Sequence, residues 1–109
     1  MDDRRRAPRY GVELEGIIRS GLRGDDKVAI SSLSIDGCRF ASARRRISAG
    51  TALTMALGPV GVIHASIAWR VGPIHGVRFD QALHPAVLDH IRLFLSNEPA
   101  LIEEERPAA

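Results

Sequence analysis

Strict alternation of apolar and polar residues, in short runs separated by glycine, is the feature that most limits what this chain can fold into. In residues 11–20, GVELEGIIRS, Val12 and Leu14 alternate with two glutamates, as in a strand with one buried face. Five further runs of strand character follow, at residues 27–34, 37–42, 51–58, 60–71 and 74–80. Six short strands with glycine-containing turns predict an antiparallel sandwich or a small barrel.

One segment departs from this alternation. In HPAVLDHIRLFLS, residues 84–96, apolar side chains recur at spacings of three and four, and Pro85 suits a first helical turn. The spacing predicts one amphipathic helix packed on an end or side of the barrel. Its expected core-facing residues are Val87, Leu88, Ile91, Phe94 and Leu95. The acidic, proline-containing residues 97–109 predict a disordered tail.

Size and composition limit the class of protein. A chain of 109 residues with 45% hydrophobic residues is enough for one domain with one core. No apolar run approaches the roughly 20 residues that span a bilayer, and the charged beginning does not resemble a signal peptide. A single cysteine, Cys38, cannot form an internal disulfide, which fits a reducing compartment. We therefore expect a soluble cytoplasmic protein with no membrane span.

The sequence contains no recognisable catalytic or metal-binding motif. The closest histidine pair, His84 and His90, is six residues apart, which does not put both side chains on one helix face. Cys38 and Phe40 should point inward while Arg39 points outward, so we expect a buried, inert thiol. There is no phosphate-binding glycine loop, carboxylate pair or nucleophile elbow. We expect no enzymatic activity, no cofactor and no metal.

Positive charge is concentrated in the N-terminal half. Residues 1–50 hold 11 Lys and Arg against 7 Asp and Glu, while residues 51–109 hold 4 against 6. An anionic partner should therefore bind the N-terminal half. The three arginines of RRRISAG, residues 44–50, predict a solvated loop that adds to the positive field.

Two motifs in this half form a recognisable pair. RRAPR places Arg5 and Arg9 four residues apart just before the first strand, and SLSIDG, about 25 residues later, places Ser34 three residues before Gly37. Together with GVRF at residues 76–79, they resemble the signature of PilZ domains, bacterial receptors for cyclic di-GMP: RxxxR, then Asp/Asn-x-Ser-x-x-Gly. Ser32 stands where that pattern has Asp or Asn. The resemblance covers roughly residues 4–95 and implies a mainly β fold, a six-stranded antiparallel barrel with one C-terminal helix.

The resemblance also implies a ligand site. Arginine suits cyclic di-GMP, because its planar fork donates paired hydrogen bonds to phosphate or to guanine O6 and N7, and its face stacks on purines. In the family's arrangement, the arginines bind guanine and phosphate, the serines face the donor edge of guanine, and the glycine permits a tight turn. Arginine before RxxxR is associated with a stacked ligand pair. The implied ligand-binding residues are Arg4, Arg5, Arg6, Arg9, Ser32, Ser34 and Gly37.

The expected function is therefore that of a stand-alone cyclic di-GMP receptor. Residues 1–10 would form a flexible basic arm that becomes ordered on the barrel, residues 11–96, and relays the signal to an effector protein. One alternative is a degenerate PilZ domain that has lost nucleotide binding and acts through protein contacts. A basic nucleic-acid-binding barrel is disfavoured, because such barrels expose aromatic platforms. The aromatic residues here mostly fall on strand or helix faces that suit a core: Tyr10, Phe40, Trp69, Phe79 and Phe94.

Overall fold

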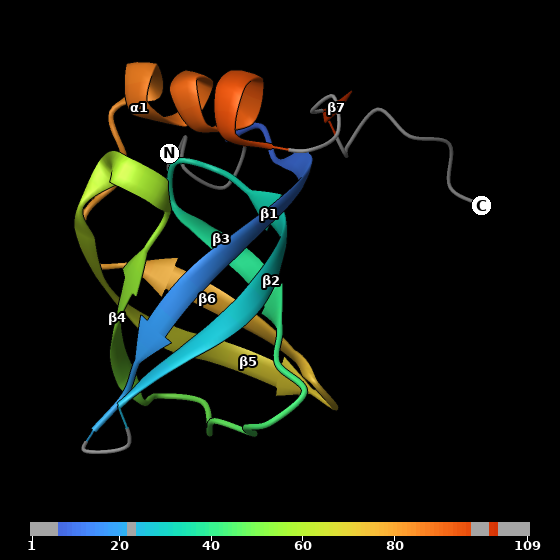
Figure 1. Ribbon diagram of the computed structural model, residues 1–109, viewed down its shortest axis with the longest axis vertical. Coiled ribbons are helices and arrows are strands. Elements are labelled where there is room, and N and C mark those ends of the chain that lie inside the picture. The colour runs from blue at the N-terminus through green and yellow to red at the C-terminus, as the bar shows by residue number, and fades with distance from the viewer. Residues whose placement is uncertain (1–6, 22–23, 97–100, 103–109) are drawn as a thin grey trace.

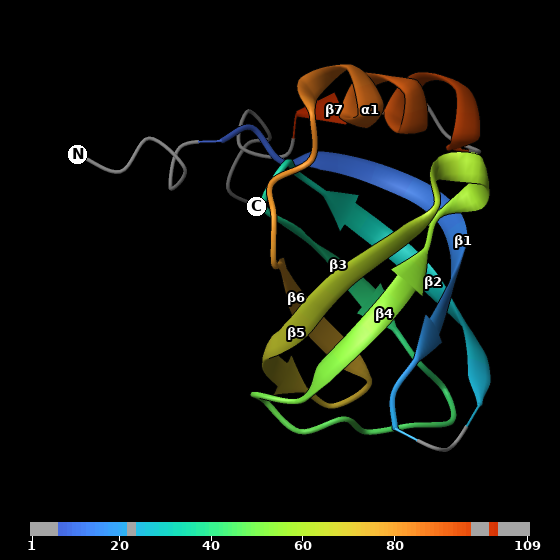
Figure 2. The same ribbon diagram turned by 90° about the vertical axis from the view of Figure 1, so that its left-hand side faces the viewer.

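The computed structural model describes residues 7–21, 24–96 and 101–102, and within them six antiparallel strands close into a barrel (Figures 1 and 2). Around the barrel the strands run β2-β3-β6-β5-β4-β1, and β1 pairs again with β2. Their bounds are β1 Tyr10–Arg19, β2 Asp25–Leu33, β3 Gly37–Ala41, β4 Ala52–Ala56, β5 Val62–Val71 and β6 Ile74–Phe79. The barrel and its C-terminal helix confirm the predicted fold.

Alternation along the strands determines the core. Inward residues of the strands are buried while their neighbours face solvent, most regularly along β1 from Val12 to Arg19. Phe40 and Phe79, from β3 and β6, are among the largest fully buried side chains. Cys38 is buried beside Met55, with 3.7 Å between the two sulfur atoms, as the inward orientation of Cys38 predicted.

A helical segment covers one end of the barrel (Figure 1). It comprises α1, Pro85–His90, and a π-helical turn, Ile91–Leu95. The Nδ1 atom of His84 accepts a hydrogen bond from the Ala86 backbone N–H at 3.0 Å, which caps the helix start. Leu88 and Ile91 are buried under it, as predicted.

The predicted inward orientation of Phe94 is wrong, because its side chain is 73% exposed. The backbone N–H of Ser96 bonds to the Ile91 carbonyl, five residues back, at 3.1 Å. A π turn is wider than an α turn, so a residue three positions after Ile91 no longer lies above it. Phe94 is therefore turned towards solvent, although the α-helical spacing of the sequence placed it in the core.

The predicted inward orientation of Trp69 is also wrong. Along β5 the buried residues are Ile63, Ala65 and Ile67, and strict alternation would next bury residue 69. The pairing of β5 with β6 shifts between Ile67 and Trp69, as in a β-bulge. An extra residue at this point reverses the side-chain alternation, so Trp69 lies on the outer face and is 43% exposed.

The end of the helix holds the beginning of β1. The Arg92 guanidinium lies over the Tyr10 ring, 4.4 Å from its centroid. The backbone N–H of Glu13 donates to the Ser96 hydroxyl at 2.9 Å. A two-residue strand, β7 (Leu101–Ile102), pairs with Tyr10 and Gly11, within the segment predicted as a disordered tail. The other residues after Ser96 lie outside the described part of the chain.

The loop with three arginines is partly buried rather than wholly solvated. Arg44 and Arg46 are exposed, but the Arg45 side chain is only 9% exposed and its Nη1 atom donates to an Asp26 carboxylate oxygen at 2.8 Å. Asp26 belongs to β2, which begins two residues before the predicted start at residue 27. This ion pair attaches the loop to the barrel wall.

No helix in the described residues is long and apolar enough to cross a membrane.

Candidate functional site

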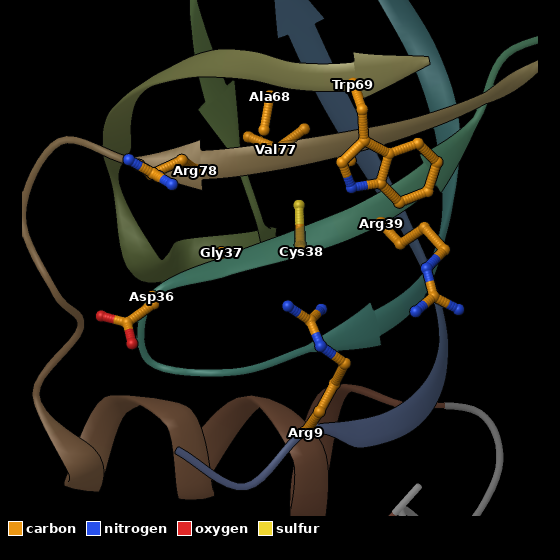
Figure 3. Close-up of a pocket in the computed structure, with 10 residues that line it drawn as sticks. Arg9, Asp36, Gly37, Cys38, Arg39, Ala68, Trp69, Val77 and Arg78 are labelled. Carbon is orange, nitrogen blue, oxygen red and sulfur yellow. The ribbon is translucent and has the colours of Figure 1, made fainter. Parts of the chain in front are cut away.

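A pocket of about 420 Å3 lies on the outer face of the barrel, over β3, β6 and β5 (Figure 3). Arg9 approaches it from the segment before β1, and Arg39, Arg78 and Trp69 come from the three strands. Asp36 is the one acidic residue among its lining residues. The lining therefore combines three cations, one carboxylate and one aromatic ring.

Strand register explains why these side chains meet. Gly76 in β6 pairs with Arg39 in β3 on one side and with Trp69 in β5 on the other. These three residues share the outer face, so Arg39 and Trp69 flank a position that has no side chain. Gly37, one row further along, pairs with Arg78. Both glycines are among the residues that line the pocket.

The Trp69 ring lies against the backbone of Gly76. A Cβ atom added to Gly76 would overlap the indole ring. The absence of a side chain at Gly76 therefore permits this close approach of Trp69. The partly exposed indole forms a flat apolar wall on one side of the pocket (Figure 3).

Charge makes the pocket suited to an anion. Guanidinium groups stay protonated at all physiological pH values, and the three arginines outnumber the single carboxylate of Asp36. Arginine forks bind phosphate or carboxylate through paired hydrogen bonds, and an exposed indole stacks on planar rings. The site can therefore bind a ligand that is both anionic and aromatic.

Among the residues implied by the PilZ resemblance, the structure brings Arg9 and Gly37 to the pocket lining. Ser32 and Ser34 lie beneath the surface, 0% and 3% exposed. The Arg9 Nη1 atom donates to the Ser32 hydroxyl at 3.1 Å. Ser32 thus contacts an arginine that lines the pocket and is not itself a lining residue, and its implied contact with a ligand stays a prediction.

Ser34 stabilises the turn between β2 and β3. Its hydroxyl accepts from the Asp36 backbone N–H at 3.1 Å, and its backbone N–H donates to the Gly37 carbonyl at 2.9 Å. These bonds fix the turn that carries Asp36 into the pocket. Like Ser32, Ser34 acts here on the position of another residue.

The reason for glycine at position 37 differs from the one expected. Gly37 is not among the glycines with positive φ, so the turn does not need its conformational freedom. Instead, an added Cβ atom would overlap the Val77 carbonyl oxygen of β6. The close approach of β3 to β6 is therefore what excludes any other residue.

Arg4, Arg5 and Arg6 lie outside the described residues, so their implied contacts stay predictions. Sequence reasoning missed Arg39, Arg78, Trp69 and Asp36 as lining residues. Arg39 and Arg78 could have been found from the outward positions of β3 and β6. Trp69 could not, because its orientation depends on the bulge in β5.

The predicted inert thiol can be compared with the structure. Burial raises the pKa of the Cys38 thiol to about 12, an effect that nearby Arg9 only partly opposes, so at neutral pH the group is an unreactive thiol. Within residues 7–21, 24–96 and 101–102, no three His, Cys, Asp or Glu side chains are grouped so as to hold a metal ion.

Comparison of the sequence with models of known protein families and with curated protein sequences finds no match.

Proposed function

We propose that this chain binds cyclic di-GMP at the pocket over β3, β6 and β5, as a receptor of the PilZ type without catalytic activity. Its support begins with the two motifs: Arg9, the last residue of RRAPR, lines the pocket, and so do Asp36 and Gly37 of SLSIDG. Arg9 and Ser32, one from each motif, are 23 residues apart in the sequence and are joined by a hydrogen bond.

The ligand's chemistry matches the pocket lining. Cyclic di-GMP has two phosphates, and each guanine presents O6 and N7 acceptors on one edge and N1 and N2 donors on another. Arginine binds phosphate and the O6/N7 edge with paired hydrogen bonds. The Asp36 carboxylate suits the donor edge, a role that the family pattern gives to the residue at the position of Ser32. Trp69 suits stacking on a guanine ring.

One observation carries the proposal. Arg9, Arg39 and Arg78 reach a single hollow beside an exposed indole although they come from three separate segments of the chain. An arginine placed only for solubility needs no such convergence. Bringing three like charges together has an electrostatic cost, which a dianionic ligand would offset.

Isothermal titration with cyclic di-GMP, GMP and cyclic di-AMP tests this proposal. Cyclic di-GMP should bind most tightly, and Arg9→Ala, Arg78→Ala and Trp69→Ala should each weaken it. A lost hydrogen bond to a charged group costs about 1.5–3 kcal/mol, so each arginine variant should lose roughly tenfold to a hundredfold in affinity. Added salt should weaken binding further.

Arg19→Ala is the matched control. Arg19 is exposed at the opposite end of β1 from Arg9, where its Nε atom donates to an Asp25 carboxylate oxygen at 2.7 Å. This variant should bind like the parent. If the parent binds no cyclic di-GMP, or if Arg19→Ala loses as much affinity as Arg9→Ala, the proposed site is wrong. Absence of all nucleotide binding would favour the alternative of a degenerate domain acting through protein contacts.

A second candidate, single-stranded nucleic acid, is favoured by one observation. Trp69 is 43% exposed among arginines, which is the combination of stacking platform and positive groove found in such proteins. The argument against nucleic-acid binding, that the aromatic residues belong to the core, therefore does not hold for Trp69. Competition decides between the two: an oligonucleotide that binds well and is not displaced by cyclic di-GMP would support the second candidate.

A further inference from the structure

An apolar hollow lies beside the helix. It measures about 290 Å3 and lies between the short 3-10 turn η2, Gly58–Val60, and α1. Figure 2 shows η2 close to the helix, on the side of the barrel formed by β4 and β5. The lining residues include no Lys, Arg, Asp or Glu; they are Pro59, Val60, Ala86, Val87 and His90.

A large apolar side chain projects next to this hollow. Phe94 is 73% exposed, the highest fraction among the exposed large hydrophobic residues of the described chain. Its ring centroid is 5.4 Å from that of His90, which lines the hollow. The Phe94 side chain and the hollow are therefore neighbours on one surface. Leu93, 57% exposed, extends the apolar area on the same helical turn.

The adjoining barrel wall is uncharged. Residues 47–69, which include η2, β4 and most of β5, contain no Lys, Arg, Asp or Glu, in a chain with 26% charged residues. This includes outward positions: Ile17, Ala56 and Val62 pair in one row across β1, β4 and β5, and Val62 is 67% exposed. An outward strand face without charge is unusual for a surface that stays in water.

We propose that this surface joins two copies of the chain in a two-fold dimer, with Phe94 of each copy inserted into the hollow of the other. A two-fold axis requires a surface that complements itself, and adjacent projection and hollow provide this. Lack of charge matters equally, because side chains near a two-fold axis lie close to their own copies, where like charges would repel. The arginine-lined face could not pair in this way.

The area that a stable protein interface buries indicates a contact that extends beyond Phe94. Stable interfaces bury about 800 Å2 on each partner. One phenylalanine in one hollow supplies only part of this, so the contact should continue over Leu93 and the row that contains Val62. Neither Phe94 nor a residue of the hollow lines the arginine pocket, so dimerisation and nucleotide binding can be tested separately.

Sedimentation velocity of the full chain at increasing concentration tests the dimer. The parent should sediment as a dimer, and Phe94→Asp should be a folded monomer, because an exposed side chain contributes little to the fold of a single chain. Val71→Asp is the matched control: Val71 is 70% exposed at the far end of β5 from Val62 and should remain dimeric. A monomeric parent, or equal effects of both variants, would overturn the proposal.

A mixing experiment tests the geometry itself. Ala86→Arg places a charge in the hollow, where Ala86 is exposed, and should also give a monomer. Mixed with Phe94→Asp, it should form a heterodimer. One contact then keeps its native Phe94 and hollow, while the other pairs Asp with Arg. Failure of the mixture to associate, with both variants folded, would show that Phe94 and the hollow do not meet.

Discussion

At the scale of single residues, the two glycines of the pocket have different neighbours. A Cβ atom at Gly37 would overlap backbone, the Val77 carbonyl oxygen, whereas one at Gly76 would overlap a side chain, the Trp69 ring. Backbone within a paired strand cannot move away without breaking the sheet. A half-exposed indole can rotate into solvent.

Alanine at each glycine should therefore have a different effect. Gly37→Ala should lower the free energy of unfolding by about 1–3 kcal/mol, as overpacking does. Gly76→Ala should change stability less but displace Trp69, altering indole fluorescence and weakening cyclic di-GMP binding. Denaturant unfolding and titration of both variants measure this. Equal stability losses would show that Trp69 is fixed by its surroundings.

His75 is a buried residue that the sequence did not single out. Its ring is 0% exposed and stacks on Phe40 with 4.6 Å between centroids. Its Nδ1–H donates to the Pro73 carbonyl, and its Nε2 accepts from the Ile47 backbone N–H, both at 3.0 Å. The ring is therefore neutral. Burial lowers its pKa against the opposing effect of the Pro73 hydrogen bond, and Arg70 and Arg46 lower it further.

The lowered pKa of His75 determines how the free energy of unfolding changes with pH. Because the folded pKa of His75 lies below the unfolded value of about 6.5, the unfolded state binds the proton first as the pH falls. The free energy of unfolding should decrease below about pH 6.5, by at most about 1.4 kcal/mol per pH unit from this group. His75→Phe should lose this slope, while His64→Asn, at an exposed strand position, should retain it. Equal slopes in parent and His75→Phe would contradict the prediction.

At the scale of elements, two local irregularities determine which side chains are exposed. The bulge in β5 turns Trp69 outward, and the π turn after α1 turns Phe94 outward. Both proposals depend on these residues: Trp69 walls the arginine pocket, and Phe94 adjoins the apolar hollow. Regular periodicity along each element would have put both residues on its buried face.

The hairpin of β1 and β2 offers a matched test of ion pairs. Asp25 and Arg19 form an ion pair at the surface, where their side chains are 52% and 64% exposed. Asp26 and Arg45 form a largely buried ion pair, with side chains 16% and 9% exposed. Asp25→Ala should cost less than about 1 kcal/mol. Asp26→Ala should cost about 3 kcal/mol, because it leaves the Arg45 guanidinium buried without its carboxylate. Urea unfolding of the two variants makes the comparison, and similar losses would mean that water reaches Arg45.

At the scale of the whole molecule, the arginine segment joins the barrel where the helix ends. Arg9 contacts Ser32, while the next residue, Tyr10, lies under Arg92. Glu13 bonds to Ser96 just beyond. A ligand that changes the position of Arg9 therefore acts on a segment that the helix also contacts. We infer that this route relays binding to an effector protein.

Hydrogen exchange measures that relay. Saturating cyclic di-GMP should slow amide exchange in residues 4–10 and 31–37 together, because the phosphates give the arginines fixed partners and offset the repulsion among them. GMP at the same concentration is the control and should protect both segments less. Bound protein in which residues 4–10 exchange as fast as without ligand would contradict the relay while leaving binding itself intact.

The sequence by itself determined the antiparallel strands, because apolar alternation and glycine turns are local properties that reflect which faces are buried. The alternation left a sandwich or a small barrel open, and the six-stranded barrel was what the PilZ resemblance implied. It also singled out Arg9 and the SLSIDG motif, and Arg9, Asp36 and Gly37 line the pocket in the structure. The other arginines of the pocket could not be predicted to join Arg9 from local sequence patterns. Arg39 and Arg78 join Arg9 only through the register of β3 and β6.

Only the tertiary structure decided what is exposed at the irregular positions. Trp69 follows the periodicity of a buried residue, and a one-residue shift in pairing between β5 and β6 reverses it. Ser32 matches a binding motif, yet it is buried against Arg9. In each case the side chain's surroundings come from strands distant in sequence. Local sequence patterns indicate which residues favour burial, whereas packing between distant segments determines which of them are buried.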